Sequence, residues 1–214
     1  MIEIKNITKT YLSDGKKINA IDDISMNIEK GEFVVIRGAS GSGKTTLLLT
    51  LGAMLKTTKG SYLFDDKDVY SLNGKERNHF RANNIGFVFQ MFHLLPYLTL
   101  LENVIVPTFG TKKEEAKKML INLGLGDRIN NKPFALSAGE KQRTAVVRAL
   151  INDPKIILAD EPTGNLDPEN ASEVMKIFSE YKENGGTVVV VTHGTEADEY
   201  ADRIVFLKNG KIVE

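Results

Sequence analysis

Five short runs of apolar residues, rich in valine and isoleucine, recur along the chain at residues 33–36, 85–89, 156–159, 187–191 and 204–207. Longer segments with helical patterning separate most of these runs. Continuous apolar strands that alternate with helices are typical of a parallel sheet covered on both faces. The pattern therefore predicts an α/β fold built on a mostly parallel sheet.

The first thirty residues follow a different pattern, in which apolar and polar side chains alternate. Residues 2–8 and 18–28 predict two strands around a turn at Ser13-Asp14-Gly15-Lys16, and residues 60–69 predict another short β segment. Alternation with a period of two is the signal of strands with one buried face. We expect these segments to form an N-terminal antiparallel β subdomain.

Helical signals dominate between residues 91 and 150, with few β signals among them. Helices are predicted over residues 99–104, 112–123 and 138–151. We interpret this stretch as an inserted helical subdomain. Three more helices are predicted elsewhere, over residues 74–82, 168–182 and 195–201.

Length and composition limit the domain organisation. With 214 residues and 42% hydrophobic content, the chain can bury one sizeable core. A single domain over residues 1–214 is expected. Its core and β subdomain would occupy residues 1–90 and 151–214, and its helical subdomain about 91–150.

Charge, cysteine content and hydropathy exclude several function classes. Lys plus Arg and Asp plus Glu both number 28, so net charge gives no attraction to nucleic acid or acidic lipid. The sequence contains no cysteine, which excludes disulfides, zinc–thiolate sites and thiol catalysis. The N-terminus lacks the pattern of a signal peptide, and no apolar run approaches membrane-spanning length. Work at a membrane would need another chain to span it.

A glycine-rich stretch follows the first apolar run and precedes the start of a helix. It matches the phosphate-binding loop G-x-x-x-x-G-K-[ST], although an ordinary glycine-rich turn carrying a lysine is the alternative. Glycines let successive N–H groups point at phosphate oxygens, and the helix N-terminus adds its positive dipole end. Lys44 can reach the β- and γ-phosphates, and the Thr45 hydroxyl can bind Mg²⁺. The candidate nucleotide-binding residues here are Gly38, Ala39, Ser40, Gly41, Ser42, Gly43, Lys44, Thr45 and Thr46.

Two carboxylates, Asp160 and Glu161, follow the apolar run at residues 156–159. Ligands of open α/β sheets bind at the carboxyl ends of the strands, so we expect this pair beside the glycine-rich loop. Asp160 would hold Mg²⁺, and Glu161 would orient or deprotonate the attacking water. An acidic pair that caps the next helix is the alternative.

The segment Leu136-Ser137-Ala138-Gly139-Glu140-Lys141-Gln142-Arg143 resembles the signature motif of ATP-binding cassette (ABC) ATPases, usually written LSGGQ. Small residues and a serine at a helix start form a second phosphate-binding cradle, to which we assign Ser137, Ala138, Gly139 and Glu140. Ser137 with Glu140 is also a capping box, and an ordinary capped helix can hold at the same time. One nucleotide does not need two cradles, so the second is expected to serve the nucleotide of a second copy.

The resemblance covers essentially the whole chain and implies roles for four further residues. Tyr11 is similar to the aromatic residue that stacks on adenine, and Gln90 to the glutamine that reaches Mg²⁺ and the lytic water. Asp167, in the segment Asn165-Leu166-Asp167, matches the loop that crosses the dimer interface, and His193 the switch histidine that hydrogen-bonds the γ-phosphate. Without the other motifs, a packing tyrosine and a surface histidine would be the ordinary interpretations.

The family resemblance implies an ATP-hydrolysing motor subunit, with ATP and Mg²⁺ as cofactors. Two copies are expected to form a head-to-tail homodimer that closes around two Mg·ATP. The implied catalytic residues are Lys44, Gln90, Glu161 and His193. The implied metal ligands are Thr45, Gln90 and Asp160.

Two positions depart from the family pattern. Ala138 replaces a glycine, which adds a Cβ near the partner's phosphates but does little damage if Ala138 is already helical. Gly194 follows His193 where many relatives have Asp, which removes a helix-capping carboxylate and puts the stiffness of this loop in question.

The stretch from His93 to Thr99, with Glu102-Asn103-Val104 and Pro107, is similar to the subfamily for lipoprotein release and macrolide export, the LolD/MacB-like ATPases. That similarity implies an integral membrane permease subunit as partner and a cytoplasmic location on the inner face of the membrane. The alternative is a mechanotransmission ATPase, FtsE-like or lipoprotein-extracting, that translocates no substrate. No nucleic-acid partner is expected. The expected docking residues for the membrane subunit are Gln90, Met91, Phe92, Leu95 and Tyr97.

Overall fold

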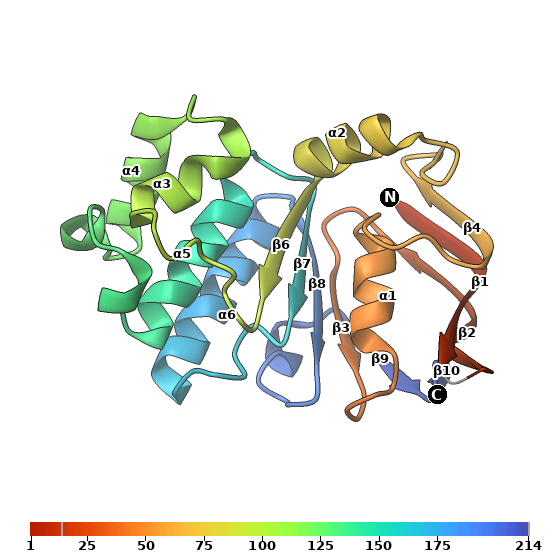
Figure 1. Ribbon diagram of the computed structural model, residues 1–214. Helices are drawn as coiled ribbons and strands as arrows, with labels where there is room; N and C mark the ends of the chain where they lie inside the picture. The colour runs from red at the N-terminus through yellow and green to blue at the C-terminus, as the bar shows by residue number, and fades with distance from the viewer. Residues whose placement is uncertain (14, 214) are drawn as a thin grey trace.

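The five apolar runs form adjacent strands of one six-stranded sheet in the computed structural model, which describes residues 1–13 and 15–213 (Figure 1). The strand order is β10-β9-β3-β8-β7-β6. All neighbours pair in parallel except β10, which runs antiparallel to β9. The strands are β3 (Phe33–Arg37), β6 (Ile85–Phe89), β7 (Ile156–Asp160), β8 (Thr187–Thr192), β9 (Arg203–Lys208) and β10 (Lys211–Val213). The predicted fold class is thereby confirmed.

The alternating N-terminal segments form a second, antiparallel sheet in the order β2-β1-β4-β5. Its strands are β1 (Ile2–Ser13), β2 (Lys16–Ile28), β4 (Lys59–Phe64) and β5 (Lys67–Asp68). β1 is longer than the predicted strand and carries register shifts between Ile4 and Thr10, so a simple period of two does not continue along it. The predicted turn at residues 13–16 includes Asp14, which lies outside the described residues.

Helix α1 (Lys44–Leu51) lies between the two sheets, and α5 (Ala138–Leu150) and α6 (Pro168–Glu183) cover the opposite face of the large sheet (Figure 1). The alternation in β3 explains this layering. Val34 and Ile36 join the cluster that contains Leu47 of α1, whereas Phe33 and Val35 join the cluster that contains Val146 of α5. Each strand thus buries both faces, as its continuous apolar sequence requires.

The remaining helices gather at one end of the molecule or at its edge. α3 (Leu100–Ile105) and α4 (Lys113–Asn122) pack with α5 around a separate apolar cluster that includes Leu101, Leu120 and Val147. α2 (Gly74–Asn84) leads into β6, and its Phe80 packs edge-to-face on Phe64 of β4. Short 3-10 turns occupy Val106–Thr108, Gly126–Arg128, Pro133–Ala135 and Asp198–Tyr200.

The helix predicted over residues 195–201 is wrong. Only one 3-10 turn, Asp198–Tyr200, forms there. A segment this short recovers little helix propagation energy for the cost of nucleation. Its side chains instead make tertiary contacts. Ala197 is buried, and the Asp198 carboxylate forms an ion pair with Arg37 at the end of β3.

Candidate active site

The glycine-rich loop connects β3 to α1 at the carboxyl edge of the large sheet. Gly43 caps α1 with a left-handed backbone, φ 105°. A Cβ at this position would lie 2.2 Å from the carbonyl oxygen of Ala20, a backbone atom of β2. The position therefore requires glycine for both conformation and space.

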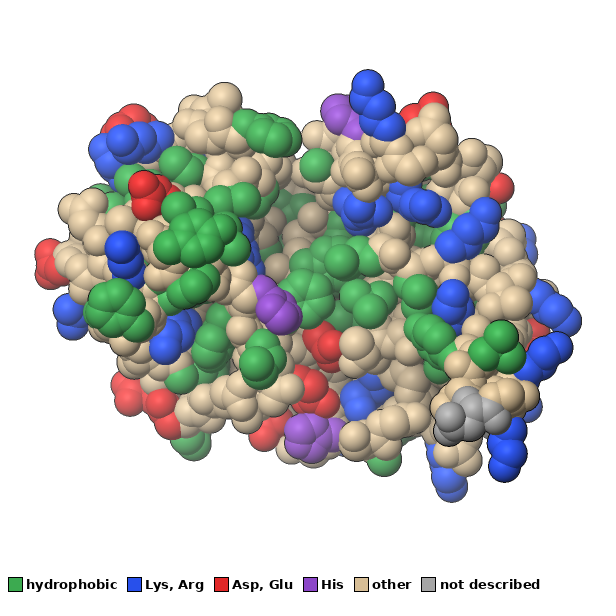
Figure 2. Space-filling view, in the orientation of Figure 1, with side chains coloured by type: hydrophobic (Ala, Val, Ile, Leu, Met, Phe, Trp, Pro, Cys, Tyr) green, Lys and Arg blue, Asp and Glu red, His purple; other side chains and the backbone are tan. Residues whose placement is uncertain are grey.

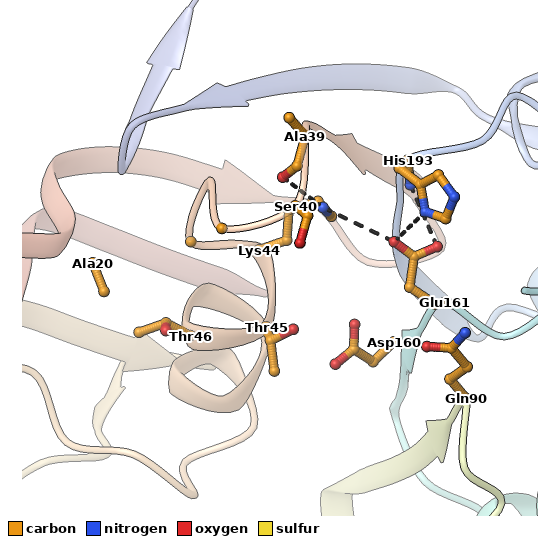
Figure 3. Close-up of a pocket in the computed structure, with 12 residues that line it drawn as sticks. Ala20, Ala39, Ser40, Lys44, Thr45, Thr46, Gln90, Asp160, Glu161 and His193 are labelled. Atoms are coloured by element: carbon orange, nitrogen blue, oxygen red, sulfur yellow. Dashed lines mark hydrogen bonds and ion pairs between the residues drawn. The ribbon is translucent and has the colours of Figure 1, made fainter.

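A cavity of about 660 Å³ opens above this loop. It brings together residues from the loop, from α1 and from the ends of β6, β7 and β8 (Figure 3). The carboxyl ends of neighbouring parallel strands meet at one edge, which explains why residues far apart in sequence converge here. The lining residues are Ala20, Ala39, Ser40, Gly41, Gly43, Lys44, Thr45, Thr46, Gln90, Asp160, Glu161 and His193.

The Lys44 side chain is buried and points back over the loop. Its ammonium group donates to the carbonyl oxygens of Gly38, at 2.7 Å, and Ala39, at 3.1 Å. The same nitrogen lies 3.9 Å from a carboxylate oxygen of Glu161. One cation thus bridges the loop and the end of β7, where a polyanion bound in the cavity would meet it.

Glu161 has a left-handed backbone, φ 47°, which turns its side chain into the cavity. Its carboxylate accepts hydrogen bonds from the Thr192 hydroxyl, at 3.0 Å, and from the His193 backbone N–H, at 3.4 Å. The His193 Nδ1 atom lies 2.8 Å from the other carboxylate oxygen. Three groups at the end of β8 therefore fix the orientation of one carboxylate.

Asp160 is the second carboxylate of the pair and lines the cavity beside Thr45 (Figure 3). Burial raises the pKa of Asp160, and a hydrogen bond with the Thr45 side chain partly offsets that rise. A buried carboxylate whose charge is disfavoured gains from a nearby cation. In the described part of the chain, no three His, Cys, Asp or Glu side chains cluster in the manner of an all-protein metal cage.

Gln90 directly follows β6 on the opposite wall of the cavity and is held by Asn165. The Asn165 amide donates to the Gln90 carbonyl oxygen at 3.1 Å, and the Gln90 amide donates to Asn165 Oδ1 at 3.4 Å. A Cβ at Gly164 would lie 2.9 Å from the Gln90 amide nitrogen. The loop after β7 thereby sets the position of the glutamine.

The signature-like residues lie at the start of α5 and do not line this cavity. Ser137 and Glu140 form the predicted capping box, since Ser137 Oγ accepts from the Glu140 N–H and Glu140 accepts from the Ser137 N–H. Ala138 is the first helical residue, so its Cβ causes no backbone strain. A Cβ at Gly139 would overlap the side chain of Asn170, the residue whose N–H bonds the capping carboxylate of Asp167.

Tyr11 also lies outside the set of lining residues. It is 42% exposed on β1, with the Lys9 ammonium 5.3 Å from its ring centroid. Ala20 of β2 lines the cavity on that side and has no signal in the sequence beyond its place in a strand. Thr192 and Asn165, which hold Glu161 and Gln90, are not among the predicted site residues, although Thr192 directly precedes His193 and Asn165 begins the predicted loop that contains Asp167.

Comparison with known proteins identifies relatives along the whole chain. A family model described as "ABC transporter" matches residues 21–164. The lipoprotein-releasing system ATP-binding protein LolD of Aquifex aeolicus is 49% identical over 196 residues, covering 89% of this chain and 88% of the relative. The macrolide export ATP-binding/permease protein MacB of Chlorobaculum tepidum is 43% identical over 219 residues, covering all of this chain and 34% of the relative. The chain thus spans about a third of the MacB relatives that it matches.

Solved structures of one cassette, MJ0796, superimpose closely on this chain. A dimeric structure described as a bacterial ABC transporter cassette has a TM-score of 0.94 and 41% identity. A dimeric post-hydrolysis state bound to ADP and Pi has a TM-score of 0.92 and 40% identity. Both cover 100% of this chain and 97% of that cassette.

Proposed function

This chain belongs to the ABC transporter family of ATP-binding, ATP-hydrolysing domains, and from that premise we propose that two copies close head to tail around two Mg·ATP to drive a separate membrane subunit. One observation carries the proposal. The cavity gathers Lys44, Asp160, Glu161 and His193, whereas the exposed helix start at Ser137 lies outside it. A second phosphate cradle that lies outside its own site is suited to the nucleotide of another copy.

ATP would bind with its phosphates over the glycine-rich loop. The N–H groups of the loop and the start of α1 would surround the phosphates, with the Lys44 ammonium against the β- and γ-phosphates. Tyr11 would stack on the base from β1. The ring is exposed on β1, the strand paired with β2, and Ala20 of β2 borders the cavity on that side.

Mg²⁺ fits the donor set beside the loop. Thr45 and Asp160 offer a hydroxyl and a carboxylate, and Gln90 offers an amide oxygen across the cavity. Mg²⁺ takes one or two protein carboxylates, phosphate oxygens and water, so a cage of several acidic side chains is not needed. The burial that raises the pKa of Asp160 makes a cation there favourable. The bound ion would offset negative charge on the phosphates.

Glu161 would act as the base that takes a proton from the attacking water. The contacts from Thr192 and His193 hold the carboxylate toward the cavity, which is the positioning that general-base catalysis needs. His193 would contact the γ-phosphate, and Gln90 would reach the same water. Only ATP presents a γ-phosphate that can bridge two copies. ATP binding would therefore close the dimer, and hydrolysis would reopen it.

The membrane subunit would dock on the segment that follows Gln90. Met91 and Tyr97 are 72% and 67% exposed within one short segment rich in apolar side chains, and sizeable exposed apolar patches mark interaction sites. We also propose residues 91–150 as a helical subdomain that moves with nucleotide state. No helix in the described part of the chain has the length and apolar character needed to cross a bilayer. The location would be the inner face of the cell membrane, through this partner.

The names of the relatives include lipoprotein release and macrolide export, which supports a transport role. A mechanotransmission ATPase that moves no substrate would use the same residues, and the proposal leaves the cargo open. The span number and extracytoplasmic domain of the membrane subunit encoded beside this gene would distinguish the two roles.

Mixing two inactive variants tests the dimer arrangement. Ser137→Arg should obstruct the nucleotide of the partner, and Lys44→Ala should disable the chain's own loop. A head-to-tail mixed dimer places both defects in one site and leaves the other intact. We expect ATP hydrolysis by an equimolar mixture to exceed the sum of the separate variants.

Ser61→Arg, which adds the same charge on the exposed surface of β4, is the matched control and should hydrolyse ATP normally. If the mixture recovers neither hydrolysis nor an ATP-dependent dimer, each chain completes its own site and the proposed arrangement is wrong.

A further inference from the structure

The backbone directly after Gln90 adopts an unusual conformation. Phe92 and His93 are consecutive, carry bulky side chains, and both have a left-handed backbone, with φ 55° and 49°. This region is disfavoured for residues that have a Cβ, and two in succession persist only when surrounding contacts impose them. The turn must therefore be held by something outside it.

Arg148 of α5 provides that hold. One guanidinium nitrogen donates to the Phe92 carbonyl oxygen and another to the His93 carbonyl oxygen, each at 2.6 Å. The side chain is partly buried, and burial lowers its pKa. No ion pair within the described residues includes Arg148, so its charge is directed at these two carbonyl groups.

The opposite end of the same segment is fastened by Asn165, through the pair of amide hydrogen bonds to Gln90. Gln90 faces Asp160 and Glu161 across the cavity (Figure 3). Only Met91 lies between Gln90 and the left-handed turn that Arg148 contacts. A change at the Arg148 contact is therefore transmitted to Gln90 through very few rotatable bonds.

We propose that Arg148 is a positioning residue for Gln90: its planar fork holds the strained Phe92–His93 turn and so ties the glutamine to helix α5, which begins at the signature-like segment. This inference rests on the proposed function, in which Gln90 reaches Mg²⁺ and the attacking water. Two parallel N–H groups in a rigid plane suit two adjacent carbonyl oxygens, and a lysine ammonium cannot reproduce that geometry.

Arg148 also borders a cavity of about 240 Å³ with Phe87, Phe89 and Pro107. Figure 2 shows the surface hollowed between the α3–α4 region and α2, with hydrophobic side chains on its floor. Simple packing of the arginine stem in this groove is the competing explanation. Packing predicts only a loss of stability when Arg148 is changed. Positioning also predicts faster hydrogen exchange in the Phe92–His93 turn and a lower kcat.

The experiment compares wild type with Arg148→Lys. We expect kcat for Mg·ATP to fall about tenfold or more while KM changes little, because the glycine-rich loop that binds the phosphates is unchanged and only Gln90 is displaced. Hydrogen exchange measured without nucleotide should become faster at residues 91–95 and stay unchanged in the centre of α5. Unchanged exchange at residues 91–95 would overturn the inference even if kcat falls.

A rescue series isolates the strain. Glycine adopts a left-handed backbone without cost, so His93→Gly added to Arg148→Lys should restore much of kcat and of the protection. His93→Ala is the matched control, because it also loses the ring contact with Phe89 but keeps the Cβ, and it should not rescue. Equal behaviour of the Gly and Ala variants would contradict the proposal.

Two safeguards keep the test decisive. If Arg148→Lys does not fold, Arg148→Gln takes its place in the same series with the same expected losses, since its shorter, uncharged side chain lacks the guanidinium fork. If wild type itself shows no ATP hydrolysis, the proposed function fails, and the exchange measurements still decide whether Arg148 holds the turn.

Discussion

The Nδ1 atom of His193 lies 2.8 Å from a carboxylate oxygen of Glu161, although the two residues follow different strands, β8 and β7. These strands are neighbours in the sheet, and Glu161 N–H also bonds the Val191 carbonyl oxygen at 2.9 Å. The contact thus joins the expected base to the expected γ-phosphate sensor. Any shift of the loop after β8 must move the Glu161 carboxylate as well.

We expect Glu161→Gln to retain ATP binding and to slow hydrolysis by about 10²-fold or more. The amide keeps the shape of the side chain but cannot accept a proton from water. Because ATP is then not consumed, a dimer should accumulate with ATP and appear by size-exclusion chromatography.

Glu180→Gln, an exposed position on α6, is the control for the same chemical change and should behave as wild type. Wild-type turnover in Glu161→Gln would exclude Glu161 as the base. A slow variant that stays monomeric with ATP would instead count against the nucleotide-bridged dimer.

Lys44→Ala should weaken Mg·ATP binding by about 100-fold, the loss expected for charge-assisted hydrogen bonds to a polyanion. An equilibrium titration with a non-hydrolysable ATP analogue measures the affinity. Lys59→Ala removes an exposed lysine from β4 and should leave it unchanged. Unchanged affinity in Lys44→Ala would show that the glycine-rich loop does not bind the nucleotide.

Asp160→Asn should abolish Mg²⁺-dependent hydrolysis, with a loss of at least about 10²-fold, yet raise the thermal stability of the protein without nucleotide. Burial raises the folded-state pKa of Asp160, so the native state holds a proton more readily than the unfolded chain. Above the folded-state pKa, the buried charge lowers the free energy of unfolding by its full amount. This destabilisation decreases as the pH falls through the folded-state pKa. The gain in Tm should therefore be largest near neutral pH and shrink toward acid. A gain independent of pH would contradict this explanation.

Strands were predicted most accurately from the sequence, because burial on both faces leaves a direct apolar signal. The run at residues 156–159 became β7 almost residue for residue. β10 has no such signal, since its three residues are exposed and it forms by pairing with the edge strand β9. The segment at residues 195–201 carries helix-forming residues, but the pairing of Asp198 with Arg37 decides its conformation.

The site was predictable where a motif has fixed spacing and a fixed place on a strand end. The residues that position the predicted site residues could not be predicted, because each contacts a partner from a distant part of the chain. Arg148 contacts carbonyl groups more than fifty positions earlier, and Asn165, after β7, contacts Gln90, after the neighbouring strand β6. Asn103 had a usable signal, a polar residue among the apolar residues of α3, but only the fold reveals its partners.

Asn103 is fully buried and fastens the loop that precedes α3. Its side chain accepts from the Leu95 N–H and donates to the carbonyl oxygens of Leu95, Leu98 and Thr99. Asn103→Ala leaves several of these groups without a partner and should lower the free energy of unfolding by about 2–3 kcal/mol. Chemical denaturation measures the change, with Asn122→Ala at the exposed end of α4 as the control. Equal stability of the two variants would show that water replaces Asn103.

Tyr97→Asp tests the proposed membrane-subunit surface, because it places a charge on a side chain that is already 67% exposed. An exposed position tolerates aspartate without desolvation, so the isolated protein should fold and keep its basal ATP hydrolysis. An apolar partner helix seated there would have to bury that charge, so assembly with the membrane subunit should be lost. Co-purification with the membrane subunit and ATPase assays of the isolated chain measure the two effects. Tyr97→Phe, which keeps the apolar ring, should assemble normally. Unfolding of Tyr97→Asp would show that the ring belongs to the core, and normal assembly would place the docking surface elsewhere.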